Sequence, residues 1–194
     1  VWEAGNAPSS TAETYDFVRQ LARKAGGTIG KAFSLMDSAK LYDIAPGQYK
    51  YDASFEVFLP AYGEPFIFLN PTGGTMDRLT FAHEFGHFCN DYALGGSVAG
   101  IDVAEVFSQA MEFMSLCYTD KGSELKKMKM ADSLCVYVEQ AAYASFEHQL
   151  YRLPDEKLTV DGIRQLYETV GQDFGFDSRG WDSREYIGIN HFFT

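Results

Sequence analysis

The chain has 194 residues, of which 46% are hydrophobic and 15% aromatic, so one globular domain is expected and intrinsic disorder is excluded. Its net charge of −11 argues against nucleic acid or an anionic membrane as a partner, because phosphate groups attract basic surfaces. No apolar run reaches the roughly eighteen residues of a membrane span. An odd number of cysteines without paired spacing predicts free buried thiols and a reducing compartment, the cytoplasm. The cysteines are Cys89, Cys117 and Cys135.

The first part of the chain predicts two helices and two short strands. The first helix begins at Ser10 or Thr11, either of which can cap it, and ends at Gly26-Gly27. The next elements are predicted as a helix over residues 30–41 and strands over residues 54–59 and 66–69. Either strand could hold an extended peptide by backbone pairing, or both could form a structural hairpin. The fold class is therefore mainly α with a small β-sheet (α+β).

The next helix carries the most informative motif in the sequence, and Thr75 or Asp77 can cap it. His83 and His87 lie four residues apart, so both imidazoles project from one face and can take two corners of a tetrahedral metal site. Glu84 lies beside that face, where a carboxylate can accept a proton from a metal-bound water. H-E-x-x-H on a helix is typical of zinc hydrolases; the alternative is a histidine pair without metal.

A third protein ligand is needed, and few residues can supply it. The chain's histidines are His83, His87, His148 and His191. A metzincin would place its third histidine six residues after the second, where this chain has Ala93. The first glutamate after Glu84 is Glu105, eighteen residues past His87, with glycines between them that let the chain reverse. Glu105 is therefore the predicted third ligand.

The helix that begins near residue 101 has one polar stripe on an otherwise apolar segment. The stripe consists of Glu105, Ser108, Gln109 and Glu112. It contains no lysine or arginine, which a solvated face usually carries, so we predict that it faces the metal. A solvated face is the alternative. Glu112, with Ser108, is predicted to orient the metal ligands from behind.

A long helix is predicted from residue 123 to about residue 153, and a shorter one over residues 161–170. Three lysines make the first two turns of the long helix basic, which we interpret as an ordinary solvated face. They are Lys126, Lys127 and Lys129. His148, farther along the same helix, is interpreted as structural.

Two motifs resemble the oligoendopeptidase F and thimet oligopeptidase family of zinc peptidases. His83-Glu84-Phe85-Gly86-His87 has the form H-E-x-G-H, and residues 105–112 look like the family's E-x-x-S-x-x-x-E segment. Residues 187–193 resemble the segment in which that family places a substrate-binding histidine. The resemblance implies a zincin-like (gluzincin) core with Zn²⁺ on the two motif histidines and Glu105. It also implies Glu84 as the general base and His191 near the substrate or the developing oxyanion.

The same resemblance implies a zinc-dependent endopeptidase, an oligopeptidase that hydrolyses short peptides through a zinc-activated water. Family members are far longer, and their transition-state tyrosines follow the terminal histidine by several residues, whereas this sequence stops at Thr194. We therefore expect residues 1–194 to be a single catalytic domain from a longer chain. Without the missing N- and C-terminal regions, it is expected to be weak or inactive as a peptidase.

Two other functions remain open. A gluzincin aminopeptidase uses a similar spacing from histidine to glutamate, although no acidic anchor for a free amine is visible in the sequence. A non-catalytic helical binding domain with a degenerate metal site is the second alternative. That reading predicts no bound metal and a Glu105 side chain that points to solvent.

Overall fold

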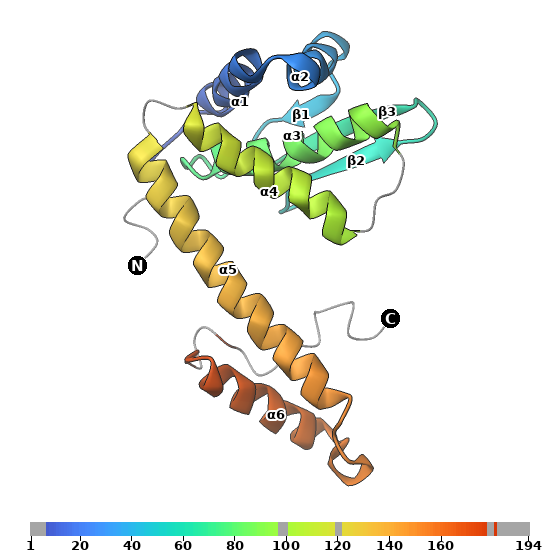
Figure 1. Ribbon diagram of the computed structural model, residues 1–194, viewed down its shortest axis with the longest axis vertical. Helices are drawn as coiled ribbons and strands as arrows, with labels where there is room; N and C mark the ends of the chain where they lie inside the picture. Colours follow the sequence, from blue (N-terminus) through green and yellow to red (C-terminus); the bar gives the residue numbers. More distant parts are fainter. Residues whose placement is uncertain (1–6, 97–100, 119–121, 178–180, 182–194) are drawn as a thin grey trace. The chain divides into compact units, whose positions relative to one another are not determined.

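The computed structural model describes most of the chain as helix with one small sheet (Figure 1). The described residues are 7–96, 101–118, 122–177 and Trp181. By its internal contacts the chain divides into two units, residues 1–129 and 130–194. No helix in the described part of the chain is long and apolar enough to cross a membrane. The predicted fold class, mainly α with a small sheet, is confirmed.

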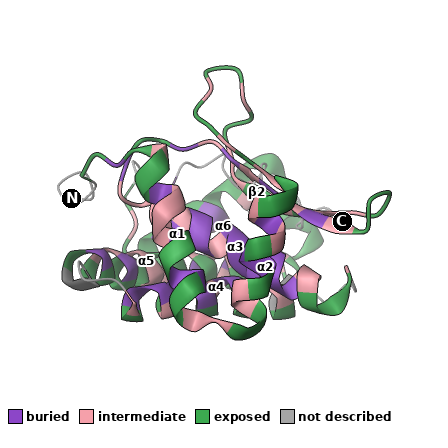
Figure 2. Cartoon of the chain, turned by 90° about the horizontal axis from the view of Figure 1, so that it is seen from above, coloured by how far each residue is buried: buried purple, intermediate pink, exposed green. Residues whose placement is uncertain are grey.

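Helix α3 (Asp77–Leu94) is the central element of the first unit (Figure 1). It contacts the sheet and three helices, which are α1 (Thr11–Ala25), α2 (Gly27–Ala39) and α4 (Ile101–Cys117). More than half of its residues are buried, and the purple ribbon in Figure 2 follows it through the middle of the unit. Because water cannot reach most of this helix, its polar side chains must find partners within the protein.

The sheet has the strand order β1-β3-β2, with β2 at an edge. The strands are β1 (Tyr42–Ile44), β2 (Phe55–Leu59) and β3 (Glu64–Leu69). β2 and β3 pair antiparallel and confirm the two predicted strands. β1, which the sequence did not reveal, pairs parallel with β3, placing Tyr42 opposite Ile67. β1 has only three residues, too few to show the alternation of apolar and polar residues that marks a strand in the sequence. It is a strand because it pairs with β3.

The first two helices follow their local signals closely. Ser10 caps α1 with a full capping box, in which its side chain accepts from the Glu13 amide and the Glu13 carboxylate accepts from the Ser10 amide. Gly26 has a φ of +64°, which ends α1 and lets α2 begin at the next residue. The second helix therefore begins at Gly27, three residues earlier than predicted.

The start of α3 differs from the prediction that Thr75 or Asp77 would cap it. The helix has no side-chain cap at its first residue. The buried Asp77 carboxylate instead accepts hydrogen bonds from the backbone amides of residues 72, 73 and 74, and from the Thr72 hydroxyl. Asp77 thus braces the loop that leads from β3 into α3.

Helix α5 (Gly122–Leu150) begins in the first unit and continues into the second, which also contains α6 (Val160–Asp173). Both helices were predicted within a few residues. The core of the second unit centres on Trp181, whose indole donates to the backbone carbonyl of Tyr167 at 2.9 Å. A Cβ on Gly171 would lie 2.4 Å from the indole ring, so the glycine makes room for this packing.

The cysteines are free, as predicted, but only one of them is buried. Cys89 lies inside α3, where burial raises the pKa of its thiol to about 12. Cys117 and Cys135 are exposed, which corrects the prediction of buried thiols. Both occupy exposed positions of helices, α4 and α5, and the sequence around each cysteine does not show which face it occupies.

Candidate metal centre

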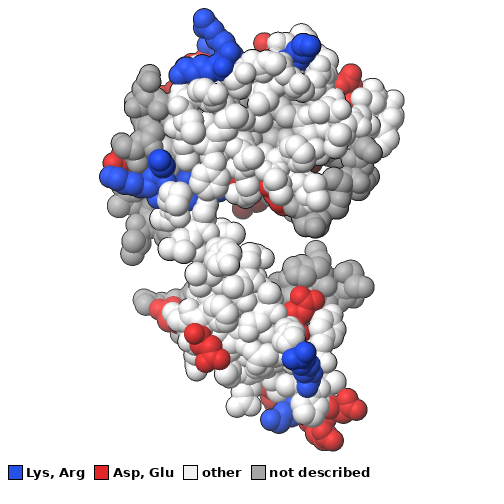
Figure 3. All heavy atoms as spheres, viewed as in Figure 1, with Lys and Arg blue, Asp and Glu red and all other residues white. Residues whose placement is uncertain are grey.

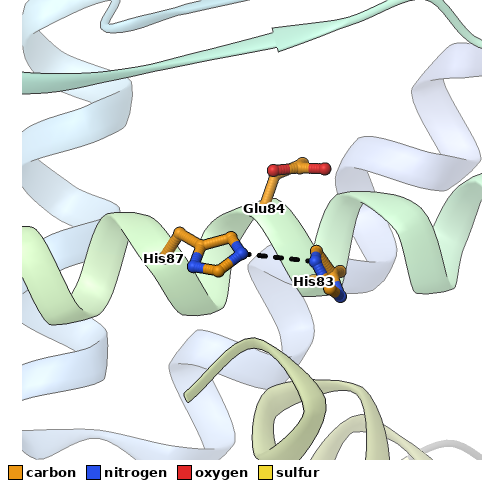
Figure 4. A group of neighbouring side chains, drawn as sticks. All are labelled: His83, Glu84 and His87. Atoms are coloured by element: carbon orange, nitrogen blue, oxygen red, sulfur yellow. Dashed lines mark hydrogen bonds between the residues drawn. The ribbon is translucent and has the colours of Figure 1, made fainter. Parts of the chain in front are cut away.

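Helix α3 directs His83 and His87 to the same side, as their spacing requires (Figure 4). Their Nε2 atoms lie 3.3 Å apart, and the two rings meet nearly edge to face. Glu84 points from the other side of the same turn, toward the sheet. One ligand atom from each of these three side chains lies within 4.8 Å of the others.

Glu105 on α4 closes this group from the opposite helix. One of its carboxylate oxygens lies 3.4 Å from His83 Nε2, and the other lies 3.5 Å from His87 Nε2. The Ser108 hydroxyl donates to the Glu105 carboxylate at 2.7 Å and so fixes its direction. The side chain is 46% exposed, yet it turns back over the two imidazoles rather than into solvent.

These spacings fit a tetrahedral zinc ion. Ligand atoms about 2.0–2.2 Å from Zn²⁺ at tetrahedral corners are separated from one another by about 3.3–3.6 Å. The two histidine nitrogens, 3.3 Å apart, match this value. The 3.4 and 3.5 Å separations run to different oxygens of Glu105, so its carboxylate faces both nitrogens and offers one oxygen to each side of the site. Two imidazoles and one carboxylate are also the donor set of many catalytic zinc sites, which leave a fourth position open.

A tight contact between two helices makes this arrangement possible. Gly86 lies on α3 between the two histidines, and the backbone of α4 passes directly over it. A Cβ at Gly86 would lie 2.6 Å from the Cα of Ser108 and 2.8 Å from the carbonyl oxygen of Phe107. Only glycine therefore allows α4 to approach closely enough for Glu105 to reach both imidazoles.

Glu112 contacts His83 from the side opposite Glu105. Its carboxylate lies 2.9 Å from His83 Nδ1, and the residue is buried. Although burial, the largest effect, lowers the pKa of His83, the hydrogen bond to Glu112 and the nearby carboxylates raise it overall. The pKa of His87 is lowered, mainly by burial, and this favours its neutral form. Glu112 thus contacts His83 and Ser108 contacts Glu105, and their predicted role in orienting metal ligands stays a prediction.

Lys129 corrects the interpretation of the basic turns of α5. Its side chain is 4% exposed, whereas that of Lys127 is 75% exposed. The Lys129 ammonium lies 2.6 Å from the Glu112 carboxylate and donates to the Gln109 side chain at 3.1 Å. A signal existed in the sequence, because Lys129 lies one turn after the buried Leu125 and so shares its inward face.

Glu84 is buried, and its ionisation reflects that environment. Burial raises the pKa of its carboxyl to about 7, and the charge of His83 and a hydrogen bond from the backbone of Glu56 offset the rise only in part. A carboxyl group with a pKa near neutrality can both accept and release a proton under physiological conditions.

Glu56 is a second acidic side chain near this group, and no motif in the sequence pointed to it. It faces inward from the edge strand β2, and one of its buried carboxyl oxygens has no hydrogen-bond partner among the described residues. Burial, followed by the charges of Asp91 and Glu84, raises its pKa to about 8. Its flanking residues Phe55 and Val57 are exposed, so the strand turns its apolar side outward. Alternation in the sequence revealed a strand but not its orientation.

His191 lies outside the described residues, so its placement near a substrate stays a prediction. The same holds for the rest of the segment 187–193.

The fold is similar to that of several solved peptidases. PZ peptidase A, solved with an inhibitor, matches 94% of this chain with a TM-score of 0.75 and 19% sequence identity. A chain described as an oligoendopeptidase F matches 94% of it with a TM-score of 0.70 and 22% identity. Another oligoendopeptidase F chain, from Bacillus anthracis, matches 88% of it with a TM-score of 0.71 and 16% identity. The chain therefore shares the fold of this part of these peptidases.

The match covers 34%, 36% and 33% of those three chains respectively, so this sequence spans about a third of their length. No family model matches the sequence, and no curated protein does. At these identities the likeness concerns the fold, and it supports the resemblance to oligoendopeptidase F that the two motifs indicated.

Proposed function

We propose that this chain is the zinc-binding part of a metallopeptidase that hydrolyses short peptides. The observation that carries the proposal is the Glu105 carboxylate on α4, whose two oxygens each lie within 3.5 Å of one of the two histidine nitrogens on α3, which are themselves 3.3 Å apart. The fold shared with solved peptidases supports the same reaction class. A non-catalytic binding domain with a degenerate metal site would be expected to point Glu105 to solvent. The Glu105 carboxylate instead lies against both imidazoles, which weighs against that alternative.

His83 Nε2, His87 Nε2 and the Glu105 carboxylate would hold the ion. When bound, Zn²⁺ supplies a Lewis acid that polarises the scissile carbonyl and lowers the pKa of water. The remaining steps belong to side chains of this chain. Ser108 keeps the Glu105 carboxylate directed at the imidazoles, and Glu112 accepts a hydrogen bond from His83 Nδ1–H so that Nε2 is free to coordinate.

Glu84 is proposed as the general base. Its carboxylate lies beside the ligand atoms without being needed as one of the three ligands. It would take a proton from the attacking water and transfer that proton to the amine nitrogen that leaves. A pKa near 7 suits both halves of this transfer, since neither gaining nor losing the proton is strongly unfavourable at neutral pH.

The substrate class and the role of His191 belong to the same proposal. Short peptides are the substrates expected from the resemblance, and His191 is proposed to lie near the substrate. Because the chain spans about a third of the peptidases it matches, efficient turnover is expected of a longer protein rather than of these 194 residues alone.

The test is metal content per chain, measured by elemental analysis in the wild type and two variants. We expect close to one zinc in the wild type and a large loss in Glu105→Ala. Glu124→Ala is the matched control, because it removes an exposed carboxylate that pairs only with Lys127 among the described contacts. A wild-type chain that binds no zinc even when zinc is supplied would overturn the proposal.

A further inference from the structure

The metal centre is built mainly from acidic and neutral groups, with one buried cation behind it. α4 contributes two glutamates and has no lysine or arginine. In Figure 3 the face of the first unit is largely white, with its blue side chains near the margins. The positive charge nearest Glu112 is the ammonium of Lys129, which belongs to a different helix and lies out of reach of solvent.

Each oxygen of the Glu112 carboxylate has a separate partner. Oε1 lies 2.9 Å from His83 Nδ1, and Oε2 lies 2.6 Å from Lys129 Nζ. The ammonium is also held by the Gln109 side-chain oxygen at 3.1 Å and lies over the Phe113 ring. The result is a continuous chain of contacts from α5, through α4, to the histidine on α3.

This chain of contacts determines which nitrogen of His83 carries a proton. A carboxylate can only accept a hydrogen bond, so Nδ1 must be the donor and must be protonated. The neutral imidazole then has its lone pair on Nε2, the atom that faces His87 and Glu105. Metal coordination at Nε2 requires that tautomer.

Lys129 matters because Glu112 is buried. Without the ammonium, Oε2 would lose its counter-charge in a place where water cannot replace it. The carboxylate would then gain by rotating toward solvent, and the contact between Oε1 and His83 would be lost with that rotation. An exposed lysine such as Lys127 exerts no comparable hold, because water screens it.

We propose that Lys129 is a positioning residue of the metal centre: through Glu112 it holds His83 as the Nδ1–H tautomer, with Nε2 free for the metal. The tautomer of His83 follows from the chain's own contacts, whereas an effect of Lys129 on metal affinity rests on the proposed function.

The first test uses the metal-free protein and nitrogen NMR of the histidine side chains at alkaline pH. We expect His83 in the wild type to be mainly the Nδ1–H tautomer, and Lys129→Met to shift it toward a mixture. Lys127→Met, the same substitution at the exposed position two residues earlier, should leave the spectrum unchanged. A wild-type His83 that is mainly the Nε2–H tautomer would overturn the proposal without any variant.

The second test is zinc affinity by competition with a chelator. Lys129→Met is expected to weaken zinc binding about tenfold, and Glu112→Gln by about 10–100-fold. Because Lys129 acts through Glu112, adding Lys129→Met to Glu112→Gln should cause no further loss. Lys129→Arg, which keeps the charge, should remain close to the wild type. An unchanged affinity in Lys129→Met, or an equal loss in the Glu112→Gln background, contradicts the proposal.

The two tests separate this inference from the proposed function. A wild-type chain that binds no zinc removes the metallopeptidase proposal, while the tautomer measurement still decides the role of Lys129. If Lys129→Met does not fold, as far-UV circular dichroism would show, Lys129→Gln takes its place, because glutamine keeps a hydrogen-bond donor without the charge. A fixed Nδ1–H tautomer in that variant would show that the ammonium is not needed.

Discussion

Gly86 of α3 lies against the backbone of Ser108 in α4 so closely that a single added carbon would stand 2.6 Å from the Ser108 Cα. The glycine of the H-E-x-G-H motif therefore determines the distance between the helix that carries the histidines and the helix that carries Glu105. Neither helix can yield by moving a side chain, because the clash involves backbone atoms on α4.

Gly86→Ala is expected to push the two helices apart. Overpacking of this kind costs about 1–3 kcal/mol of folding free energy. It should also weaken zinc binding by about tenfold or more, because Glu105 moves away from both imidazoles. Urea unfolding and chelator competition measure the two effects. Gly30→Ala is the control, since its Cβ would meet only one backbone oxygen at an ordinary 3.4 Å. Equal behaviour of the two variants would show that the α3–α4 spacing is not set by Gly86.

Glu84→Gln should separate metal binding from hydrolysis. Glutamine keeps the shape of the side chain but cannot accept a proton, so in the longer protein of which efficient turnover is expected, cleavage of a quenched fluorescent peptide should fall at least about 100-fold. Zinc content should stay near the wild-type value. In the wild type, hydrolysis should decline as the pH falls and Glu84 takes up its proton. Without metal the pKa of Glu84 is about 7, and a bound cation would move this decline to a lower pH, because a positive charge lowers a carboxyl pKa. Loss of zinc in this variant would identify Glu84 as a ligand instead of a base.

Glu56→Gln is expected to stabilise the metal-free protein at high pH. In the folded chain Glu56 ionises near pH 8 instead of its ordinary 4.5, so between these values the folded state holds a proton that the unfolded state has released. Its effect on stability is therefore absent below pH 4.5 and becomes increasingly unfavourable as the pH rises to 8. We expect a gain of about 1–2 kcal/mol at pH 8 and none at about pH 4, allowing for partial solvent screening. Urea unfolding at both pH values measures it, with exposed Glu124→Gln as the control. A gain of the same size at both pH values would refute the raised pKa.

Asp77→Ala should destabilise the first unit by about 2–4 kcal/mol, since it leaves three backbone amides and one hydroxyl without their common acceptor. Thr75→Ala, in the same loop, loses one exposed hydrogen bond to the backbone of Ala7 and should cost less than about 1 kcal/mol. Denaturant unfolding compares them. A similar small cost for both would mean that the loop is held by something other than the Asp77 carboxylate.

The parts of the fold that local rules govern could be predicted from the sequence. The two histidines share a face because their spacing matches a helical turn, and Ser10 caps α1 because Glu13 follows at the position of a capping box. Glu105 followed from elimination, since few residues of the right type come after His87. The structure places its carboxylate against both imidazoles, and its role as a ligand stays a prediction.

The remaining features depend on distant parts of the chain. β1 exists because β3 pairs with it, and Asp77 turns to a loop whose path no local rule determines. Lys129 was grouped with its exposed neighbours: its spacing from Leu125 puts it on the inward face of α5, but the sequence does not reveal that Glu112 lies opposite that face. Glu56 lies inward on a strand whose alternation permits either orientation.

The contacts from Lys129 through Glu112 to His83 join residues that are 46 positions apart in the sequence and belong to three helices. A chain emerging during synthesis exposes the two histidines well before the lysine that orders them. In the proposed zinc site, an ion bound before α5 docks would be held about tenfold more weakly, and the docking of α5 would tighten it. Bound zinc and a docked α5 would accordingly stabilise each other, and chelation would lower the melting temperature of the three helices together.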